Sequence, residues 1–349
     1  MRMESSNGSH NFILSKLFNL PQFYSSAKEY VSGINREHFK RLALDLFRYQ
    51  HAHNALYRQY CDMIGCKASA VTELIQIPFL PISFFKSQRV QTGTWEQADL
   101  IFESSGTTGE IPSRHYVRNV ALYECSLLRG FIEVFGAVED WTILALLPSY
   151  LERKNASLVH MAKTLMKFSN QEHNGFYLNE WELLKSRLLT QQASGKKTLL
   201  LGVTFALLDF ASDYPMDLSS ITVMETGGMK GRREEWTREQ VHELLKLQWN
   251  LNQVATEYGM TELLSQAYAA KEGQLKSAST MQVLVRETND PLSTNEQGAG
   301  ILNIIDLANV DSCAFIATED MGRIYEDGSF EVLGRMDHAA LRGCSLMHV

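Results

Sequence analysis

The sequence has no long hydrophobic run, no surplus of positive charge and no paired cysteine spacing. Apolar runs such as residues 199–201 are far shorter than the roughly 20 residues that a membrane-spanning helix needs. A net charge of −7 provides no broad basic face for nucleic acid. The five cysteines are odd in number and lack zinc-site spacing, which indicates free thiols. We therefore expect no transmembrane segment, no nucleic-acid partner and no cysteine-bound metal.

The sequence also lacks a recognisable secretory signal, because residues 1–11 are polar and contain no apolar core. A cytoplasmic location is therefore expected. With 349 residues and 45% hydrophobic content, the chain can bury a large core as one large domain or two subdomains. These features are typical of a soluble enzyme but do not identify one.

What the sequence does contain is a loop of small polar residues after the apolar run 100–102. Its glycines permit successive backbone N–H groups to turn toward one anion, and its hydroxyls add donors or a magnesium ligand. It is not a P-loop, because no Gly-Lys-Ser/Thr closes it and the nearest following cation is Arg114. The loop predicts a phosphate site and hence ATP binding, with a solvated turn as the alternative for this segment alone. The loop residues are Ser104, Ser105, Gly106, Thr107, Thr108 and Gly109.

Two further motifs follow the loop. Residues 255–263 read Ala-Thr-Glu-Tyr-Gly-Met-Thr-Glu-Leu, and residues 334–337 read Gly-Arg-Met-Asp. With the loop, these motifs resemble the adenylate-forming superfamily, which includes acyl-CoA synthetases, luciferases and peptide-synthetase adenylation domains. Members of that superfamily join a carboxylate to AMP. Three matches in the family's order are hard to obtain by chance.

A closer resemblance is to the acyl-protein synthetase subunit of the bacterial bioluminescence fatty acid reductase. It covers roughly residues 70 to 347, whereas the first 70 residues carry no usable motif. The resemblance implies ATP-dependent activation of a carboxylic acid, typically a fatty acid, with Mg2+ as the metal. It also implies an acyl-acceptor partner such as an acyl reductase. The segments that carry the resemblance are 77–83, 147–153, 226–233 and 341–347.

The resemblance implies a role for each motif residue. The loop would hold the leaving phosphates, with the hydroxyls of Thr107 and Thr108 as donors and Thr107 also at the metal. Glu262 would bind Mg2+, a hard cation suited to carboxylate and phosphate oxygens. Taken singly, each residue is more often structural, so the ordered set carries the prediction. The other implied contacts are Tyr258 with adenine, Thr261 with the α-phosphate, Asp320 with the ribose, and Gly227, Gly228, Gly259 and Arg335 with the nucleotide.

The apolar segments predict an α/β fold. Strand 198–203 followed by helix 205–210, and strand 221–224 followed by a long helix, are β-α units of a parallel sheet. Ligands of such sheets bind beyond the carboxyl ends of the strands. A hairpin at residues 327–328 predicts a small antiparallel part. The resemblance implies the large N-terminal domain of an adenylate-forming enzyme, and we expect an adenylation body in 1–270, a β-rich subdomain in 271–335 and a tail in 336–349.

Two amphipathic helices are also expected. Apolar residues at helical spacing predict one helix over 35–63 that stops near Gly65. Asn155 is expected to cap a second helix that contains Met161. The segment 148–166 is a candidate wall of the acyl pocket, although periodicity alone favours simple core packing for its methionines.

The sequence departs from acyl-CoA synthetases near its C-terminal end. Only 14 residues follow Arg335 in the 349-residue chain, fewer than the roughly 50 that a domain needs. The mobile C-terminal lid of those enzymes, which supplies a lysine and part of a coenzyme A tunnel, is therefore expected to be missing. Lys230, Arg232 and Arg114 are candidates to replace the lysine.

The tail contains Cys344 at the place where the resembled subunit has its acyl-accepting cysteine. Thioester formation needs a thiolate, which the nearby Arg342 would favour if the tail folds suitably. The resemblance thus implies that Cys344 accepts the acyl group. An unreactive tail cysteine is the alternative.

Three functions remain open at this point. The first is an acyl-protein synthetase that forms acyl-AMP, releases pyrophosphate and passes the acyl group to Cys344 or a partner. The second is a lidless acyl-CoA synthetase, whose activity with coenzyme A would not change in Cys344→Ser. The third is a non-catalytic subunit, which would bind nucleotide without exchanging pyrophosphate.

Overall fold

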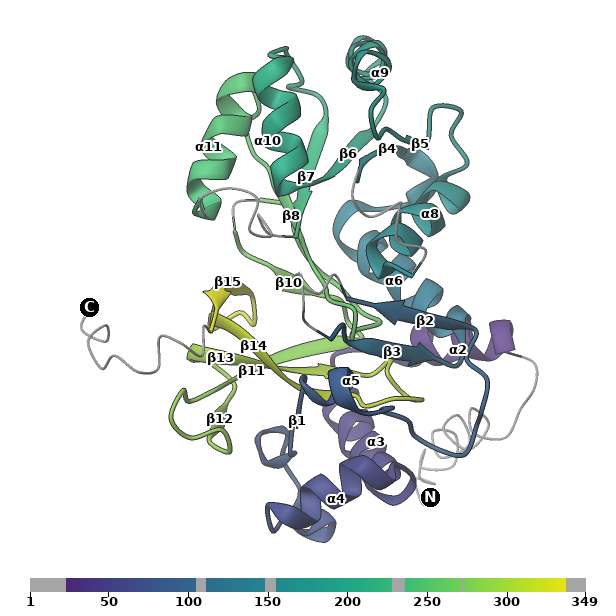
Figure 1. Ribbon diagram of the computed structural model, residues 1–349, viewed down its shortest axis with the longest axis vertical. Coiled ribbons are helices and arrows are strands. Elements are labelled where there is room, and N and C mark those ends of the chain that lie inside the picture. The colour runs from purple at the N-terminus through teal and green to yellow at the C-terminus, as the bar shows by residue number, and fades with distance from the viewer. Residues whose placement is uncertain (1–22, 105–110, 148–154, 228–235, 272, 337–349) are drawn as a thin grey trace, which may run out of the picture.

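The computed structural model of this chain describes residues 23–104, 111–147, 155–227, 236–271 and 273–336, with side chains from residue 27 onward. Most of its strands form two large sheets, which lie one above the other in Figure 1, and two further strands form a separate hairpin. Helices flank the upper sheet on both sides. Among the described residues, no helix combines the length and apolar character needed to cross a bilayer.

The upper sheet is mainly parallel. Its strands are β4 (Thr142–Leu146), β5 (Gly175–Phe176), β6 (Thr198–Val203), β7 (Thr222–Thr226), β8 (Ala255–Tyr258), β9 (Ala267–Ala269) and β10 (Lys276–Ser277). Their order is β10-β9-β8-β7-β6-β4-β5, with parallel pairing from β8 to β5. Every residue of β4 and β6 is buried, as is usual for parallel strands covered on both faces. The predicted strand 198–203 coincides with β6.

Five helices accompany this sheet: α6 (Val120–Phe135), α8 (Ser157–Ser169), α9 (Trp181–Ser194), α10 (Thr204–Asp213) and α11 (Arg238–Trp249). Helices α10 and α11 lie together on one side, and α6 and α8 lie on the other (Figure 1). Local sequence sets the helix starts. The side chain of Asn119 accepts from the N–H of Ala121 to cap α6, and Thr237 and Gln240 form a capping box at α11.

The expected role of Asn155 as a helix cap was wrong. Helix α8 has Ala156 at its N-cap position, without a side-chain hydrogen bond. The side-chain amide of Asn155 instead donates to Glu103 Oε2 at 3.4 Å, and the backbone carbonyl of Asn155 accepts from the Glu103 N–H at 2.9 Å. The side chain is therefore used to join two segments rather than to begin the helix.

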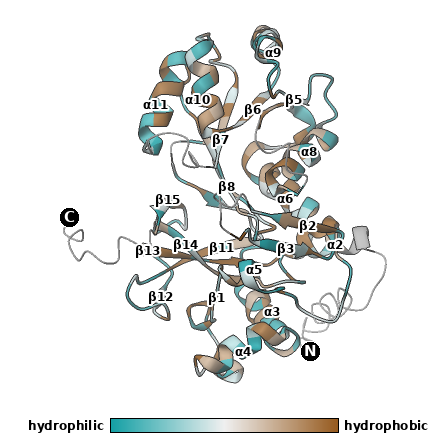
Figure 2. Ribbon diagram, viewed as in Figure 1, coloured by the Kyte–Doolittle hydropathy of each residue, from teal (hydrophilic) through white to brown (hydrophobic). Residues whose placement is uncertain are grey.

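The lower sheet is mainly antiparallel. Its strands are β1 (Leu80–Pro81), β11 (Met281–Arg286), β12 (Thr294–Asn295), β13 (Gly298–Asp306), β14 (Phe315–Ile324) and β15 (Phe330–Arg335). Their order is β1-β14-β13-β11-β12, and β15 pairs with β14. The predicted hairpin joins β14 to β15, and Gly328 adopts the positive φ of 78° that its turn requires. Strands β11 and β13 are largely hydrophobic (Figure 2).

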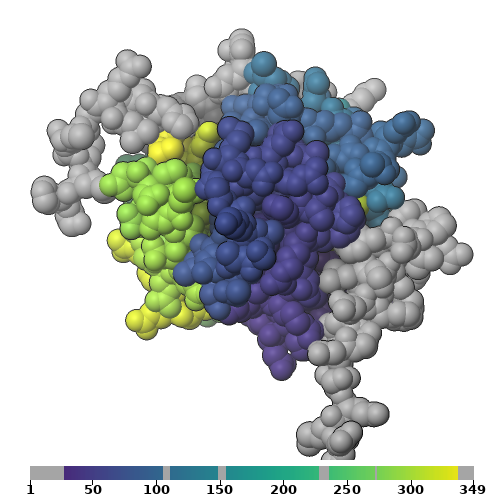
Figure 3. All heavy atoms as spheres, turned by 90° about the horizontal axis from the view of Figure 1, so that it is seen from below, coloured from purple at the N-terminus to yellow at the C-terminus, as the bar shows by residue number. Residues whose placement is uncertain are grey.

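Three α-helices of the described chain precede the first strand: α2 (Phe23–Gly33), α3 (Phe39–His53) and α4 (Ala55–Met63). Helix α2 packs against α6, and α3 and α4 lie under the lower sheet (Figure 1). Figure 3 shows this region beside the C-terminal strands. The single helix predicted over 35–63 is divided at Asn54. This residue has extended dihedrals (φ −111°, ψ 102°), and its side chain accepts from the Tyr57 N–H to begin α4. Shorter elements are η1 (Ala68–Ala70), η2 (Leu74–Gln76), α5 (Phe84–Ser87), β2 (Leu100–Glu103), β3 (Arg114–Val117) and η3 (Val138–Asp140).

Candidate functional site

The carboxyl ends of three parallel strands meet at one edge of the upper sheet. In the register of β6, β7 and β8, Val203 lies beside Thr226, and Thr226 lies beside Glu257. The chain therefore leaves the sheet at neighbouring points, one of them being Gly227, whose φ of 70° suits glycine. Such an edge is the usual ligand site of a parallel sheet.

The predicted phosphate loop is carried by the hairpin of β2 and β3. At its base the Ser104 N–H donates to the Ser113 carbonyl at 3.0 Å, and the Ser113 N–H donates to Ser104 Oγ at 2.9 Å. Arg114 forms an exposed ion pair with Glu103 at 3.1 Å. Ser105, Gly106, Thr107, Thr108 and Gly109 lie outside the described residues, as do Gly228, Lys230, Arg232 and Cys344.

Glu262 lies against the base of this hairpin. Its side chain is buried, and burial raises the pKa of its carboxyl, while the hydroxyl of Ser113 and the charge of Arg335 oppose that rise. The charge of Asp320 raises it further. Glu262, the predicted magnesium ligand, is thus close to Ser113 at the loop base and to Asp320 and Arg335, two of the predicted nucleotide residues.

Tyr258, Asp320 and Arg335 form one cluster. The Tyr258 hydroxyl donates to Asp320 Oδ2 at 2.8 Å, and Arg335 Nε lies 3.4 Å from Asp320 Oδ1. Asp320 and Arg335 are paired neighbours on β14 and β15. Burial and then Asp320 raise the Tyr258 pKa far above its usual range, so the phenol keeps its proton. Its ring meets Phe330 edge to face at 5.6 Å.

Gly259 has a packing reason for being glycine. A Cβ at this position would lie 2.4 Å from Glu257 Oε1, closer than two such atoms approach. Glu257 itself was missed by the sequence analysis, although it stands inside the 255–263 motif. Burial raises the pKa of its carboxyl to about 7, partly offset by the Thr226 hydroxyl, which donates to Oε2.

Buried groups of the lower sheet hold the turn that follows Glu262. Asp306 accepts from the N–H groups of Leu264 (2.7 Å) and Ser265 (2.9 Å) and from the Ser265 hydroxyl (2.6 Å). Asn309 Nδ2 donates to the Glu262 carbonyl at 2.8 Å. Sequence reasoning also missed these two residues, since the motif itself gives no sign of partners more than 40 residues away.

A second polar group lies behind β7, and we call Thr204, Glu225, His242 and Thr256 the β7 cluster. The Thr204 hydroxyl is 2.7 Å from Glu225 Oε1 and also contacts the Gly227 carbonyl. His242 Nε2 lies 3.8 Å from Glu225 Oε2. Within the described part of the chain, Glu225 Oε2, His242 Nε2 and Thr256 Oγ1 are buried without a hydrogen-bond partner.

The residues around Glu262 suit a magnesium ion that is held mainly by phosphate oxygens. The described residues contain no group of three or more His, Cys, Asp or Glu side chains that could hold a metal by themselves. A single carboxylate with a hydroxyl beside it matches the way Mg2+ is usually bound together with substrate phosphates.

Comparison with known proteins identifies the family. Residues 22–348 match the family described as acyl-protein synthetase, LuxE. The chain belongs to this family. The match confirms the resemblance predicted from the motifs.

Relatives in this acyl-protein synthetase family are of low identity. The chain is 23% identical over 332 residues to the long-chain-fatty-acid–luciferin-component ligase of Vibrio harveyi, an alignment that covers 88% of this chain and 86% of that protein. It is 24% identical over 359 residues to the ligase of the same name from Aliivibrio fischeri, with 93% and 91% coverage. A 70-residue stretch is 39% identical to the Photorhabdus luminescens ligase and covers 20% of this chain and 60% of that protein.

Solved structures confirm the predicted fold. ATP-bound MatB from Rhodopseudomonas palustris superposes with a TM-score of 0.52 and 16% identity, over 70% of this chain and 50% of that chain. 2-Hydroxyisobutyryl-CoA ligase in its postadenylation state gives a TM-score of 0.62 and 10% identity, over 85% and 66%. The chain thus spans half to two thirds of these solved chains and shares the α/β fold of adenylate-forming enzymes. The expected lack of a lid domain and the three domain boundaries stay predictions.

Proposed function

We propose that this protein activates a carboxylic acid with ATP. The carboxylate attacks the α-phosphorus, the bond to the leaving pyrophosphate breaks, and acyl-AMP forms. The observation that carries the proposal is the convergence of Glu262, the hairpin base at Ser113, and the pair of Asp320 and Arg335 around one motif turn. Groups that neutralise phosphate charge and fix the reactants are what this reaction needs most.

Each of these residues is positioned for a different part of Mg-ATP. Asp320 presents a carboxylate that already accepts from Tyr258, and its remaining acceptor capacity suits the ribose hydroxyls. Arg335, with 75% of its side chain exposed, is free to reach phosphate. Thr261 is half-buried and lies at the turn for the α-phosphate. Glu262, with Thr107 of the loop, would hold Mg2+, which neutralises the phosphate charge.

We further propose a long-chain fatty acid as substrate and a thiol as acceptor. The Vibrio harveyi and Aliivibrio fischeri relatives are named as long-chain-fatty-acid ligases, which supports the choice of acid. In the proposed second step, the Cys344 thiolate attacks the acyl carbonyl, AMP leaves with the bonding electrons, and a thioester forms. A partner such as an acyl reductase would then take the acyl group. We place this activity in the cytoplasm, where free thiols persist.

Intact-protein mass tests this proposal directly. The protein would be incubated with Mg-ATP and a panel of fatty and aromatic acids, beside Cys344→Ser and Glu262→Gln. The proposal predicts an ATP-dependent gain of one acyl group that hydroxylamine removes and that both variants lack. Pyrophosphate exchange without a mass gain would redirect the second step to coenzyme A or another acceptor. Absence of both would contradict the proposed function.

A further inference from the structure

His115 links the hairpin that carries the predicted phosphate loop to the turn of the 255–263 motif. It lies on β3, two residues after Ser113, and only 1% of it is exposed. Its Nδ1 is 3.0 Å from the carbonyl oxygen of Thr261, and its Nε2 is 3.0 Å from Ser312 Oγ. The ring therefore joins the loop hairpin, the motif turn and the lower sheet. Phe85 packs against it edge to face at 5.6 Å.

The partners of the ring fix the position of its proton. A carbonyl oxygen can only accept, so the Nδ1 facing Thr261 must carry hydrogen. Burial lowers the pKa of His115 to about 4, so the ring is neutral at pH 7 and has one N–H. Nε2 is then an acceptor, and the Ser312 hydroxyl donates to it. Only one of the two neutral tautomers satisfies both contacts.

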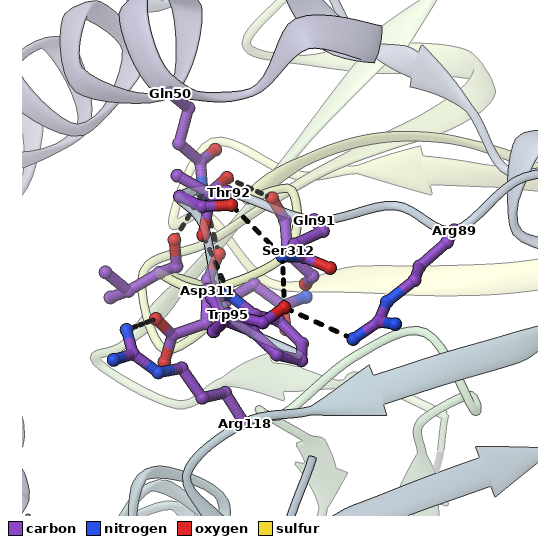
Figure 4. A network of polar contacts seen from close by, with 11 residues as sticks. Gln50, Arg89, Gln91, Thr92, Trp95, Arg118, Asp311 and Ser312 are labelled. Atoms are coloured by element: carbon purple, nitrogen blue, oxygen red, sulfur yellow. Dashed lines mark hydrogen bonds and ion pairs between the residues drawn. The ribbon is translucent and has the colours of Figure 1, made fainter. Parts of the chain in front are cut away.

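Ser312 belongs to a segment that is itself firmly held. We call residues 309–312, between β13 and β14, the clamp loop. The Ser312 carbonyl accepts from Asn54 Nδ2 at 3.0 Å and from the Thr92 hydroxyl at 2.5 Å. Gln50 donates to the carbonyls of Asn309 (2.8 Å) and Val310 (3.1 Å). Figure 4 shows Gln50, Thr92 and Ser312 converging in this network.

The other side of the clamp loop is also fixed. Arg118 Nη1 pairs with Asp311 Oδ1 at 3.2 Å, and the Thr92 N–H donates to the Asp311 carbonyl at 2.9 Å (Figure 4). Asn309 reaches the Glu262 carbonyl directly at 2.8 Å. The motif turn is thus tied to the clamp loop at two successive carbonyls, one through His115 and one through Asn309.

We propose that His115 is a positioning residue for adenylation, acting through the backbone of Thr261. Its Nδ1–H holds the Thr261 carbonyl while Ser312 orients the ring, and this fixes the turn from which Thr261 and Glu262 reach the reactants. The inference deepens the proposed function and rests on it. A displacement of about 1 Å at such a turn is enough to cost roughly 100-fold in rate.

Two substitutions separate positioning from bulk packing. His115→Phe keeps a ring of similar size and removes both hydrogen bonds. His115→Asn keeps an amide N–H near the place of Nδ1 and loses only the contact with Ser312. The matched control is His51→Phe, because His51 is a half-buried histidine of α3 that packs against Phe47 and has no part in the site.

The readout is acid-dependent pyrophosphate exchange, separated into kcat and the KM for Mg-ATP, beside urea unfolding of each variant. We expect His115→Phe to lower kcat roughly 10- to 100-fold with KM little changed, and His115→Asn to recover most of the loss. His51→Phe should exchange like the wild type. Equal losses in both His115 variants, or a loss that follows urea stability in all three, would overturn the positioning role.

A second measurement does not depend on activity or on a folded variant. Nitrogen NMR of histidine-labelled wild-type protein at pH 7 should place the His115 proton on Nδ1. The Nε2–H tautomer would overturn the inference. An Nδ1–H ring in a protein without any pyrophosphate exchange would overturn the proposed function and leave the hydrogen-bond relay intact, so the two failures are distinguishable.

Discussion

Two polar clusters flank the Tyr258 to Glu262 turn, and they differ in how completely their hydrogen bonds are made. Around the clamp loop, Gln50, Asn54 and Thr92 all meet partners, and Asn309 Oδ1 is an unpaired atom in that part of the described structure. In the β7 cluster, three buried polar atoms have no hydrogen-bond partner among the described residues.

This difference separates a largely bonded scaffold from a cluster that is only partly bonded among the described residues. Buried polar groups are stabilising only when their partners are present, and each unmade hydrogen bond costs about 1–3 kcal/mol. The clamp loop therefore fixes the motif turn from the lower sheet. The β7 cluster lies beside Gly227, and three of its buried polar atoms have no hydrogen-bond partner among the described residues.

Of substitutions in and around these two clusters, Glu262→Gln should change activity the most. The amide keeps the shape of the carboxyl but cannot neutralise phosphate charge or bind Mg2+ well, so exchange should fall roughly 100-fold or more. Since burial already penalises the charged carboxyl, stability should not fall. Steady-state exchange and urea unfolding measure the two quantities. A variant that loses stability and activity together would place Glu262 in the scaffold.

Gln50→Ala should give the opposite pattern, a loss of stability that is large for one residue. The fully buried Gln50 donates to two clamp-loop carbonyls and accepts from the Ala314 N–H at 2.9 Å. Removing it leaves three backbone groups unpaired, and we expect a loss of about 3 kcal/mol in urea unfolding. The control Arg48→Ala removes an exposed ion pair with Asp45 and should cost below about 0.5 kcal/mol.

The pH dependence of stability should show opposite contributions from His115 and Glu257. The pKa of His115 is lowered from 6.5 to about 4, so the unfolded state binds its proton first and stability is lost as pH falls from 6.5 to 4. The pKa of Glu257 is raised from 4.5 to about 7, so the unfolded state ionises first and stability is lost as pH rises from 4.5 to 7. Each full contribution is about 3 to 4 kcal/mol at roughly 1.4 kcal/mol per pH unit.

Urea unfolding at several pH values checks this pair of signs. As the pH rises from 4.5 to 8, Glu257→Gln should become more stable relative to wild type. As the pH falls from 7 to 4.5, His115→Phe should become more stable relative to wild type. If the free energy of unfolding of either variant ran parallel to that of wild type across this pH range, the substituted group would have the same pKa in the folded and unfolded states.

The smallest effects come from two matched threonines, one in each cluster. The Thr92 hydroxyl donates to the Ser312 carbonyl, so Thr92→Val should cost about 1–2 kcal/mol. The Thr256 hydroxyl is buried without a partner among the described residues, so Thr256→Val should be neutral or stabilise by up to about 1 kcal/mol. Thermal unfolding of the two variants measures this difference in stability. Equal losses would show that the two hydroxyls contribute equally.

The sequence predicted what is encoded locally. Strand β6, the hairpin at Gly328 and the order of the motifs follow from short patterns of apolar, glycine and polar residues. The single helix over 35–63 was wrong because Asn54 breaks it to bond with Thr92 and the Ser312 carbonyl, partners that the local period does not contain.

The remaining site residues were missed for the same physical reason. His115 meets Ser312 across 197 positions, and Gln50 meets Asn309 across 259. Such contacts are made when segments far apart in the sequence pack around the clamp loop, and no spacing within a segment marks them. Glu257 is the exception, since it stands inside the 255–263 motif itself, on a strand whose first three residues are buried.

Activation of a carboxylic acid by this protein can be measured as acid-dependent exchange of labelled pyrophosphate into ATP. The wild-type protein should catalyse exchange with Mg2+ and a long-chain fatty acid, and should not do so without the acid. ATP binding without exchange across a panel of acids of different length and character would contradict acid activation and identify a non-catalytic nucleotide-binding subunit.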